Sequence, residues 1–248
     1  MVRKPEAAPP RFLAPDLDPS APQVVLPHDE ARHATRVLRL GPGDAIGVFD
    51  GRGREFTARI VRARRDEVVA ELVEPATPAR EPAVPFTLVQ AVLKGPAMDD
   101  AIRDAAMMGA AAIQPVLTAH TVVKVRPDAA ERWQRVAIAS AKQCRRATVP
   151  PLLAPSTLDR WLSSNDRTLT LMLVEPSAVA EPRSLRTLLG TPAPKDAALL
   201  VGPEGGWARE EILLALAAGS VPVTLGGLTL RADAVPIAAI SVFRFLWE

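Results

Sequence analysis

The sequence contains few of the residues that build disulfide frameworks, metal sites and aromatic binding platforms. It has one cysteine, Cys144, and three scattered histidines, which exclude an internal disulfide and any Cys/His pattern with zinc spacing. Tyrosine is absent and aromatic residues make up 4% of the chain, so a broad aromatic platform for stacking RNA bases is not expected. A single cysteine is typical of a reducing cytosol, and we expect a cytoplasmic protein that holds no metal.

Long apolar runs and a large net charge are also missing. No apolar run approaches the roughly 18 residues that cross a membrane, and the amino end, rich in proline and alanine, lacks the apolar core of a secretory signal. The formal net charge is only +2, but residues 31–65 contain nine arginines against three acids. Such a local excess is typical of a protein that binds a phosphate backbone, although a solvated strand face explains the same excess.

The first third of the chain has the pattern of a small β domain. At 248 residues, 48% of them hydrophobic, the chain is long enough for two ordinary domains and apolar enough to fold. Strands are predicted at 45–49, 55–62 and 67–74, with a hairpin-type turn at Asp50-Gly51. The stretch 74–82 has three prolines in nine residues and no periodicity, as in a linker.

Beyond this linker, strands and helices alternate. The pattern predicts strands at 86–93, 112–117, 168–174, 197–202 and 221–225, and helices over about 98–109, 128–147, 207–218 and 233–247. Alternation of this kind implies a mainly parallel sheet covered on both faces. The first strand lacks the Gly-x-Gly-x-x-Gly pattern of a dinucleotide-binding fold. We therefore predict a β domain over 1–76 and an α/β domain over 82–248, without a Rossmann-type cofactor site.

Two glycine-rich turns follow apolar strands late in the chain. Leu199–Val201 leads into Gly202–Gly206, and about twenty residues later Leu225–Gly227 precedes Leu230-Arg231. Glycine adopts positive φ and lets main-chain amides approach a ligand, and the first turn lies between a strand and a helix, where open α/β sheets bind ligands. An ordinary structural turn and an anion site in a nucleotide-binding protein are the alternatives. The second lacks a Walker lysine-serine pair, because Trp207-Ala208 follows the glycines.

The order of these motifs resembles the RsmE family of ribosomal RNA uridine-N3 methyltransferases, which belongs to the SPOUT superfamily. The resemblance covers nearly the whole chain, and besides the two glycine turns it rests on Val37-Leu38-Arg39, Asp50-Gly51, Lys94 with Met98-Asp99, and Gln143 with Arg146 and Val149-Pro150. It implies a PUA-like β-barrel at the amino end, an α/β trefoil-knot domain for the rest, S-adenosylmethionine as cofactor and a homodimer. Knots are rare among folds, but the family pattern overrides that general expectation.

The resemblance also implies a site formed by the two turns and the end of an earlier strand. The expected cofactor contacts are Leu173, Val174, Gly202, Pro203, Glu204, Gly205, Gly206, Leu225, Gly226 and Leu230. Uridine N3 is a poor nucleophile until its proton leaves, so a base or a cation near the flanking carbonyl oxygens would help. We expect Arg231 to be that cation and Asp233 to be a candidate base. A plain ion pair between them, with Asp233 at a helix start, is the structural alternative.

The expected RNA partner is 16S ribosomal RNA or the small ribosomal subunit, recognised by shape and charge around a splayed-out nucleotide. Candidate phosphate contacts are Arg36, Arg39, Lys94, Arg145 and Arg146. Each can instead be a solvated surface charge, and the last two can complement a helix dipole.

The sequence departs from the family pattern at three places. These are Met107 before Met108-Gly109, Lys142 before Gln143, and Asp233 with Ala234-Val235 after Arg231-Ala232. The departures affect the expected catalysis and target more than the expected fold. They leave open a non-catalytic or retargeted relative that binds RNA as a ribosome-associated factor.

Overall fold

The chain forms two compact units in the computed structural model, which describes residues 8–179 and 183–247. The first unit contains the residues up to Arg80 together with Ala141–Val149, and the second contains Glu81–Ser140 and Pro150–Glu248. The boundary after Arg80 lies inside the proline-rich stretch 74–82. The segment 141–149 belongs to the first unit although it lies far along the chain, so a single boundary in the sequence does not separate the two units.

The first unit is built on a five-stranded sheet. Its strand order is β1 (Arg11–Leu13), β3 (Ala45–Phe49), β4 (Glu55–Arg64), β5 (Glu67–Pro75) and β2 (Gln23–Val25). The three predicted strands are β3, β4 and β5, which pair antiparallel in sequence order. The predicted turn is also confirmed, because Gly51 has a φ of 75° and the Asp50 carboxylate accepts the main-chain N–H groups of Arg52 and Arg54 at 2.7 and 3.0 Å.

Several elements of this unit are not evident in the sequence pattern. Strands β1 and β2 have three residues each, too few to show an alternation. A helix α1 (His28–Arg32) continues into the π-helical turn η1 (His33–Val37). Its small side chains Ala31 and Ala34 are fully buried in the same core as Phe12, Ile46 and Ile60. Because alanine adds little apolar area, the sequence gives only a weak hydrophobic pattern for this buried helix face.

Arg11 on β1 attaches the distant segment 141–149 to the first unit. Its guanidinium donates two hydrogen bonds of 2.7 Å to the Glu55 carboxylate and further ones to the main-chain oxygens of Ala141, Lys142 and Arg146. The oxygens of Ala141 and Lys142 lie in the last turn of a helix, where carbonyls lack helical partners, and Arg146 follows soon after this helix ends. Arg11 therefore supplies hydrogen bonds that the helix end cannot make itself.

This helix, α3 (Ala129–Gln143), ends earlier than the predicted residue 147. Arg145 adopts a left-handed backbone with φ of 67°, which stops a right-handed helix. The Lys142 ammonium then pairs with Glu30 of α1 at 2.7 Å. The unusual lysine before Gln143 therefore has a structural partner inside the first unit.

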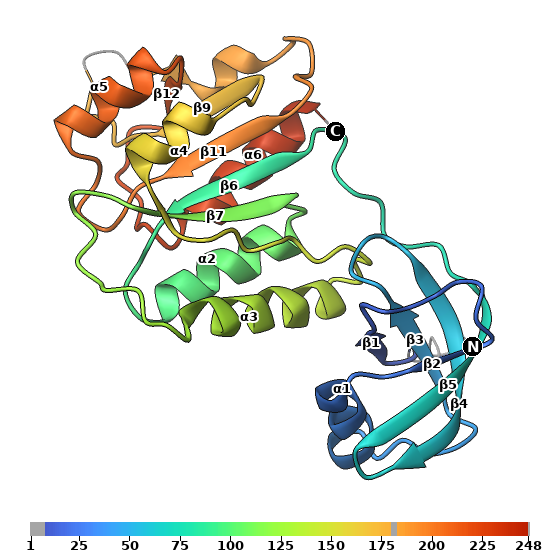
Figure 1. Cartoon of the computed structure of the whole chain (residues 1–248). Helices are drawn as coiled ribbons and strands as arrows, with labels where there is room; N and C mark the ends of the chain where they lie inside the picture. The colour runs from blue at the N-terminus through green and yellow to red at the C-terminus, as the bar shows by residue number, and fades with distance from the viewer. Residues whose placement is uncertain (1–7, 180–182, 248) are drawn as a thin grey trace, which may run out of the picture. The chain divides into compact units, whose positions relative to one another are not determined.

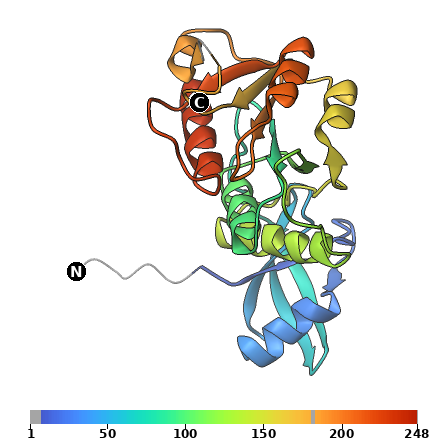
Figure 2. The same ribbon diagram turned by 90° about the vertical axis from the view of Figure 1, so that its left-hand side faces the viewer.

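The second unit is built on a seven-stranded sheet in which every neighbouring pair of strands is parallel. Its order is β10 (Arg183–Ser184), β12 (Val221–Thr224), β9 (Leu169–Leu173), β11 (Ala197–Val201), β6 (Phe86–Ala91), β7 (Ala112–Leu117) and β8 (Ser156–Thr157). The central strands β6 and β11 are buried along their whole length, as expected for a parallel sheet covered on both faces. Figures 1 and 2 show the sheet with helices on either side.

Helices cover both faces of this sheet. On one face lie α4 (Leu158–Ser164) and α5 (Arg209–Ala217), whose Trp161 and Ile212 share a core with Leu200 of β11. On the other face lie α2 (Pro96–Met107) and α6 (Val235–Trp247), and Phe243 of α6 packs on Phe86 of β6 with ring centres 5.3 Å apart. The predicted alternation of strands and helices is thus confirmed.

The sequence pattern missed the short elements of the second unit. These are α4, the two-residue strands β8 and β10, and the 3-10 turn η2 (Leu185–Leu188). Each is shorter than the window over which a periodicity can be recognised. Among the described residues, no helix combines the length and the apolar character needed to span a membrane.

Candidate functional site

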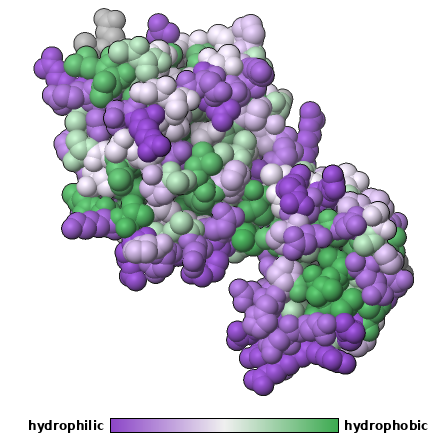
Figure 3. Space-filling model, viewed as in Figure 1, coloured by the Kyte–Doolittle hydropathy of each residue, from purple (hydrophilic) through white to green (hydrophobic). Residues whose placement is uncertain are grey.

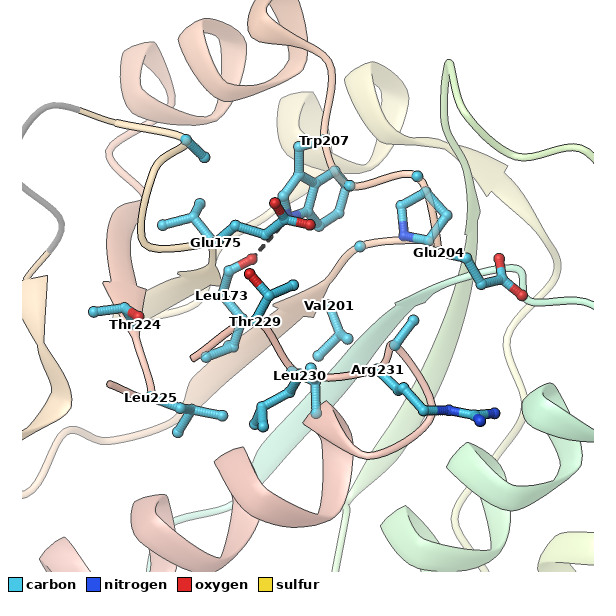
Figure 4. A pocket seen from close by; sticks show the side chains of 18 of the residues that line it. Leu173, Glu175, Val201, Glu204, Trp207, Thr224, Leu225, Thr229, Leu230 and Arg231 are labelled. Carbon is cyan, nitrogen blue, oxygen red and sulfur yellow. Dashed lines mark hydrogen bonds between the residues drawn. The ribbon is translucent and has the colours of Figure 1, made fainter. Parts of the chain in front are cut away.

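A cavity of about 700 Å³ lies where β9, β11 and β12 end. It is lined by Leu173–Pro176 after β9, by Val201–Trp207 after β11, by Thr224-Leu225 and Leu228–Asp233 after β12, and by Ala97, Ala178 and Val235. Figure 4 shows these segments around one hollow. The carboxyl edge of a parallel sheet is the usual place for a ligand in an open α/β fold, and the two glycine-rich turns form two walls of this cavity.

The structure brings nearly all of the sequence-predicted cofactor residues together here. Nine of the ten line the cavity, together with Arg231 and Asp233. Gly226 instead lines a smaller cavity of about 260 Å³, beside Leu185 and Phe245. The sequence prediction missed Glu175, Trp207 and Thr229, which also line the large cavity. Each of them stands within a few residues of a predicted site residue in the sequence, and this proximity is the signal that could have identified them.

The turn after β11 has little room for a side chain at two glycines and an unusual backbone conformation at a third. Gly206 has a φ of 70°, which non-glycine residues rarely adopt. A Cβ at Gly202 would lie 3.1 Å from the Trp207 ring, and a Cβ at Gly205 would lie 3.1 Å from Cβ of His120. The turn is therefore closely packed on its outer side, and its main chain forms the wall of the cavity.

Two side chains tie this turn to the neighbouring strand ends. The Glu204 carboxylate accepts the main-chain N–H of Lys94, which follows β6, at 3.0 Å. The Trp207 indole N–H donates to the carbonyl oxygen of Leu173, the last residue of β9, at 2.8 Å. Glu204, a predicted cofactor contact, thus already has a main-chain partner.

A buried glutamate at the start of α5 makes a third tie. Glu211 accepts the N–H of Ala119, in the loop after β7, at 2.8 Å and the N–H of Ala208 at 2.9 Å. Nδ1 of His120 lies 3.1 Å from the carbonyl oxygen of Gly206. The glycine-rich turn is therefore held to the loops after β6 and β7 and to the end of β9.

Arg231 and Asp233 form an ion pair at the edge of the cavity. The guanidinium donates two hydrogen bonds to the carboxylate, of 3.1 and 3.0 Å, while the Arg231 side chain stays 85% exposed. The hydrogen bond from Arg231 lowers the pKa of Asp233 below its ordinary value, and Asp233 in turn raises the pKa of Arg231. A carboxylate with a lowered pKa is a weaker proton acceptor, which favours the ion-pair interpretation over a general base.

The candidate RNA contacts are spread over both units. Arg36, Arg39 and Arg145 are exposed in the first unit, and Arg36 pairs with Asp66 at 2.9 Å. Lys94 is exposed in the second unit. Figure 3 shows hydrophilic side chains gathered at the end of the first unit that holds α1 and the turn between β4 and β5.

Arg146 requires a correction, because its residue is only 5% exposed. A guanidinium that is buried in the folded chain is not offered to a phosphate backbone. We therefore do not retain Arg146 among the RNA contacts. Among the described residues, no group of three or more His, Cys, Asp or Glu side chains is placed to hold a metal, and metal-independent chemistry stays a prediction.

Fold and site together define an α/β domain that binds a small molecule between glycine-rich turns, joined to a small β unit. Residues 80–244 match the family of RNA methyltransferase domains, and residues 26–73 match the RNA methyltransferase PUA domain. The chain belongs to this RNA methyltransferase family. The fold class expected from the sequence resemblance, a SPOUT-type α/β-knot domain with a PUA-like β domain, is confirmed.

Named relatives are similar over most of their length. A protein of Synechocystis sp. called ribosomal RNA small subunit methyltransferase E is 35% identical over 225 residues, which cover 91% of this chain and 74% of the relative. The protein of the same name from Mycobacterium tuberculosis is 30% identical over 96% of this chain and 93% of its own.

Solved structures are also similar to this chain over nearly its whole length. The crystal structure of ribosomal RNA small subunit methyltransferase E from Neisseria gonorrhoeae, bound to S-adenosylmethionine, is 32% identical and has a TM-score of 0.87 over 96% of this chain and 98% of its own. A methyltransferase from Legionella pneumophila with bound S-adenosylmethionine is 30% identical, with a TM-score of 0.87 over 96% and 97%.

Proposed function

We propose that this protein transfers a methyl group from S-adenosylmethionine to N3 of a uridine in the 16S RNA of the small ribosomal subunit. The observation that carries the proposal is the cavity between the two glycine-rich turns, in a chain that shares its fold and about a third of its sequence with a methyltransferase bound to that cofactor. The names of the relatives support ribosomal RNA of the small subunit as the substrate. The choice of uridine N3 as the methylated atom rests on the resemblance of the sequence motifs to the RsmE family. Because the substrate is ribosomal, we propose a cytoplasmic setting.

The residues of the cavity fit the proposed cofactor. Its volume of about 700 Å³ is in the range of pockets for drug-sized ligands. The turn Gly202–Gly206 presents main chain to the cavity, while Leu225 and Leu230 offer apolar surface to an adenine ring. When bound, S-adenosylmethionine supplies a methyl group on a positively charged sulfur. The binding task of the protein is then to hold this molecule and the base in line.

Arg231 is the residue we assign to the chemistry of the base. Loss of the N3 proton leaves negative charge on the uracil carbonyl oxygens, and a guanidinium next to them stabilises it. The two hydrogen bonds from Arg231 to Asp233 hold the planar guanidinium at the edge of the cavity. Since the pKa of Asp233 is lowered, we assign Asp233 the role of orienting Arg231.

The proposed function is tested by methyl transfer from labelled S-adenosylmethionine to small ribosomal subunits that lack the modification. We expect labelled 3-methyluridine, identified by mass spectrometry after digestion to nucleosides. Cofactor binding without transfer would favour the non-catalytic relative instead. Transfer to another nucleoside would keep the methyltransferase and refute the target.

We also propose phosphate contacts from both units. Arg36, Arg39 and Arg145 in the first unit and Lys94 in the second are exposed cations, and exposed cations that neutralise phosphates provide most of the sequence-independent affinity for RNA. Arg36 would exchange its partner Asp66 for a phosphate group. These contacts position the RNA, whereas the choice of nucleotide depends on the cavity.

We propose that the protein works as a homodimer that is held together by α6. Ile237, Ser241 and Phe245 lie on one exposed stripe of this helix, and Phe245 is 77% exposed. In the turn after β12, Leu228 is 80% exposed. Apolar side chains exposed to this extent on neighbouring elements are typical of a protein interface.

The change Phe245→Asp is expected to convert the dimer into a monomer, because it buries a charge without a partner in the proposed interface. Sedimentation velocity measures the two species directly. Leu213→Asp, at a 56% exposed leucine of α5, is the matched control and should remain dimeric. A monomeric parent protein, or a Phe245→Asp variant that stays dimeric, would rule out this interface.

A further inference from the structure

Four of the residues that line the large cavity carry a charged side chain, and three of these already have a partner. The four residues are Glu175, Glu204, Arg231 and Asp233. Glu204 accepts the main-chain N–H of Lys94, and Arg231 and Asp233 neutralise each other. Within residues 8–179 and 183–247, the Glu175 carboxylate has no hydrogen bond or ion pair. The Glu175 carboxylate therefore brings to the cavity a negative charge that no described residue binds.

This charge lies between the end of β9 and the glycine-rich turn. Glu175 follows Leu173, the last residue of β9, by two positions, and its Oε1 lies 3.4 Å from the place that a Cβ on Gly206 would take. Figure 4 shows its carboxylate beside Trp207, away from the side of the cavity where Arg231 and Glu204 lie. The absence of a side chain on Gly206 thus keeps the space next to the carboxylate open.

We propose that Glu175 attracts the positively charged sulfonium of S-adenosylmethionine and makes the cavity prefer the methyl donor to its demethylated product. The inference rests on the proposed function. The donor has a sulfonium, an ammonium and a carboxylate group, so its net charge is positive, whereas S-adenosylhomocysteine has lost the sulfonium charge. A carboxylate without a protein partner attracts the donor more strongly than the neutral product. Glu175 therefore favours release of the product after transfer.

The test compares the dissociation constants of the two ligands by isothermal titration calorimetry. For Glu175→Gln, which keeps the shape of the side chain, the dissociation constant of S-adenosylmethionine is expected to rise about tenfold, the value of one hydrogen bond to a charged group. The preference for S-adenosylmethionine over S-adenosylhomocysteine should fall by about threefold or more, since only the donor carries the sulfonium charge that Glu175 attracts.

Two further variants test whether the effect depends on the position of the charge and on the charge itself. Glu210→Gln removes the same charge from the exposed first turn of α5, outside the cavity, and should change neither constant. Glu175→Asp keeps the charge and should retain most of the preference between the two ligands. Circular dichroism confirms that each variant is folded before it is titrated.

Unchanged affinity for S-adenosylmethionine in Glu175→Gln would overturn the inference, and so would an equal loss of affinity for both ligands. A loss of turnover at unchanged affinity would also overturn it, because Glu175 would then act on the base and not on the cofactor. If the parent protein bound neither ligand, the proposed function would fail instead. The two failures are therefore distinguishable.

Discussion

Replacing Arg231 with alanine is expected to reduce methyl transfer by about 100- to 1000-fold, the usual cost of removing one donor that stabilises a developing anion. The affinity for S-adenosylmethionine should change little, because the guanidinium is bonded to Asp233 and its side chain is 85% exposed. The measurement is single-turnover transfer of labelled methyl groups to small ribosomal subunits, with cofactor binding determined separately. A loss of kcat with unchanged cofactor affinity identifies an interaction made in the transition state.

Two variants separate the charge of Arg231 from its geometry. Arg231→Lys keeps the charge but loses the planar pair of hydrogen bonds, so it should recover only part of the rate. Asp233→Asn weakens the hold on the guanidinium and should cost less than Arg231→Ala, in agreement with an orienting role. If Arg231→Ala kept full turnover, or if Asp233→Asn were the more damaging change, the assignment of roles would be wrong.

Replacing Arg11 with methionine is expected to destabilise the first unit by about 3–5 kcal/mol, since it leaves the Glu55 carboxylate as a buried charge without its partner. The two side chains are 4% and 9% exposed, and the guanidinium also lies 4.6 Å from the centre of the Phe49 ring. The change further removes the hydrogen bonds to the segment 141–146. The segment 141–149 should therefore be attached less firmly, by the Lys142–Glu30 pair and by main-chain hydrogen bonds with Gly51 and Gly53.

The unfolding of a chain with two units need not be two-state, so hydrogen exchange followed by mass spectrometry is the appropriate measurement. We expect faster exchange in peptides that cover β3 to β5 and residues 141–149. Arg62→Ala breaks the Arg62–Glu67 pair, whose side chains are 51% and 41% exposed, and should cost less than about 1 kcal/mol. Arg11→Met combined with Glu55→Leu should recover part of the loss. Equal effects of Arg11→Met and Arg62→Ala would show that the buried network does not stabilise the unit.

Long elements with a clear period were predictable from the sequence because their signal is local. Strand β11 is a continuous apolar run, β6 is mostly apolar, and α2 and α5 follow strands at the expected places. The same elements place their connecting turns at one edge of the sheet, so nine of the ten cofactor residues named in advance line the cavity. Gly226 is the exception, since it faces the smaller cavity beside Phe245.

The roles of charged side chains were much less predictable. Glu204 has a main-chain partner after β6, Arg146 is buried, and Glu175 is left without a partner among the described residues although no motif contains it. In each case the deciding neighbour lies on another strand end or in a distant segment. Hydrogen bonding and burial depend on these neighbours, which a local pattern does not contain.

By itself, then, the sequence determined the α/β class, the two glycine-rich turns and the family, because backbone freedom and hydrophobic period are properties of neighbouring residues along the chain. Only the tertiary structure decided that residues 141–149 belong to the first unit, that Asp233 neutralises Arg231, and that the Glu175 carboxylate at the cavity has no partner among the described residues. The physical reason is that the free energy of a charge is set by the groups around it in space, and folding brings those groups from separate parts of the chain.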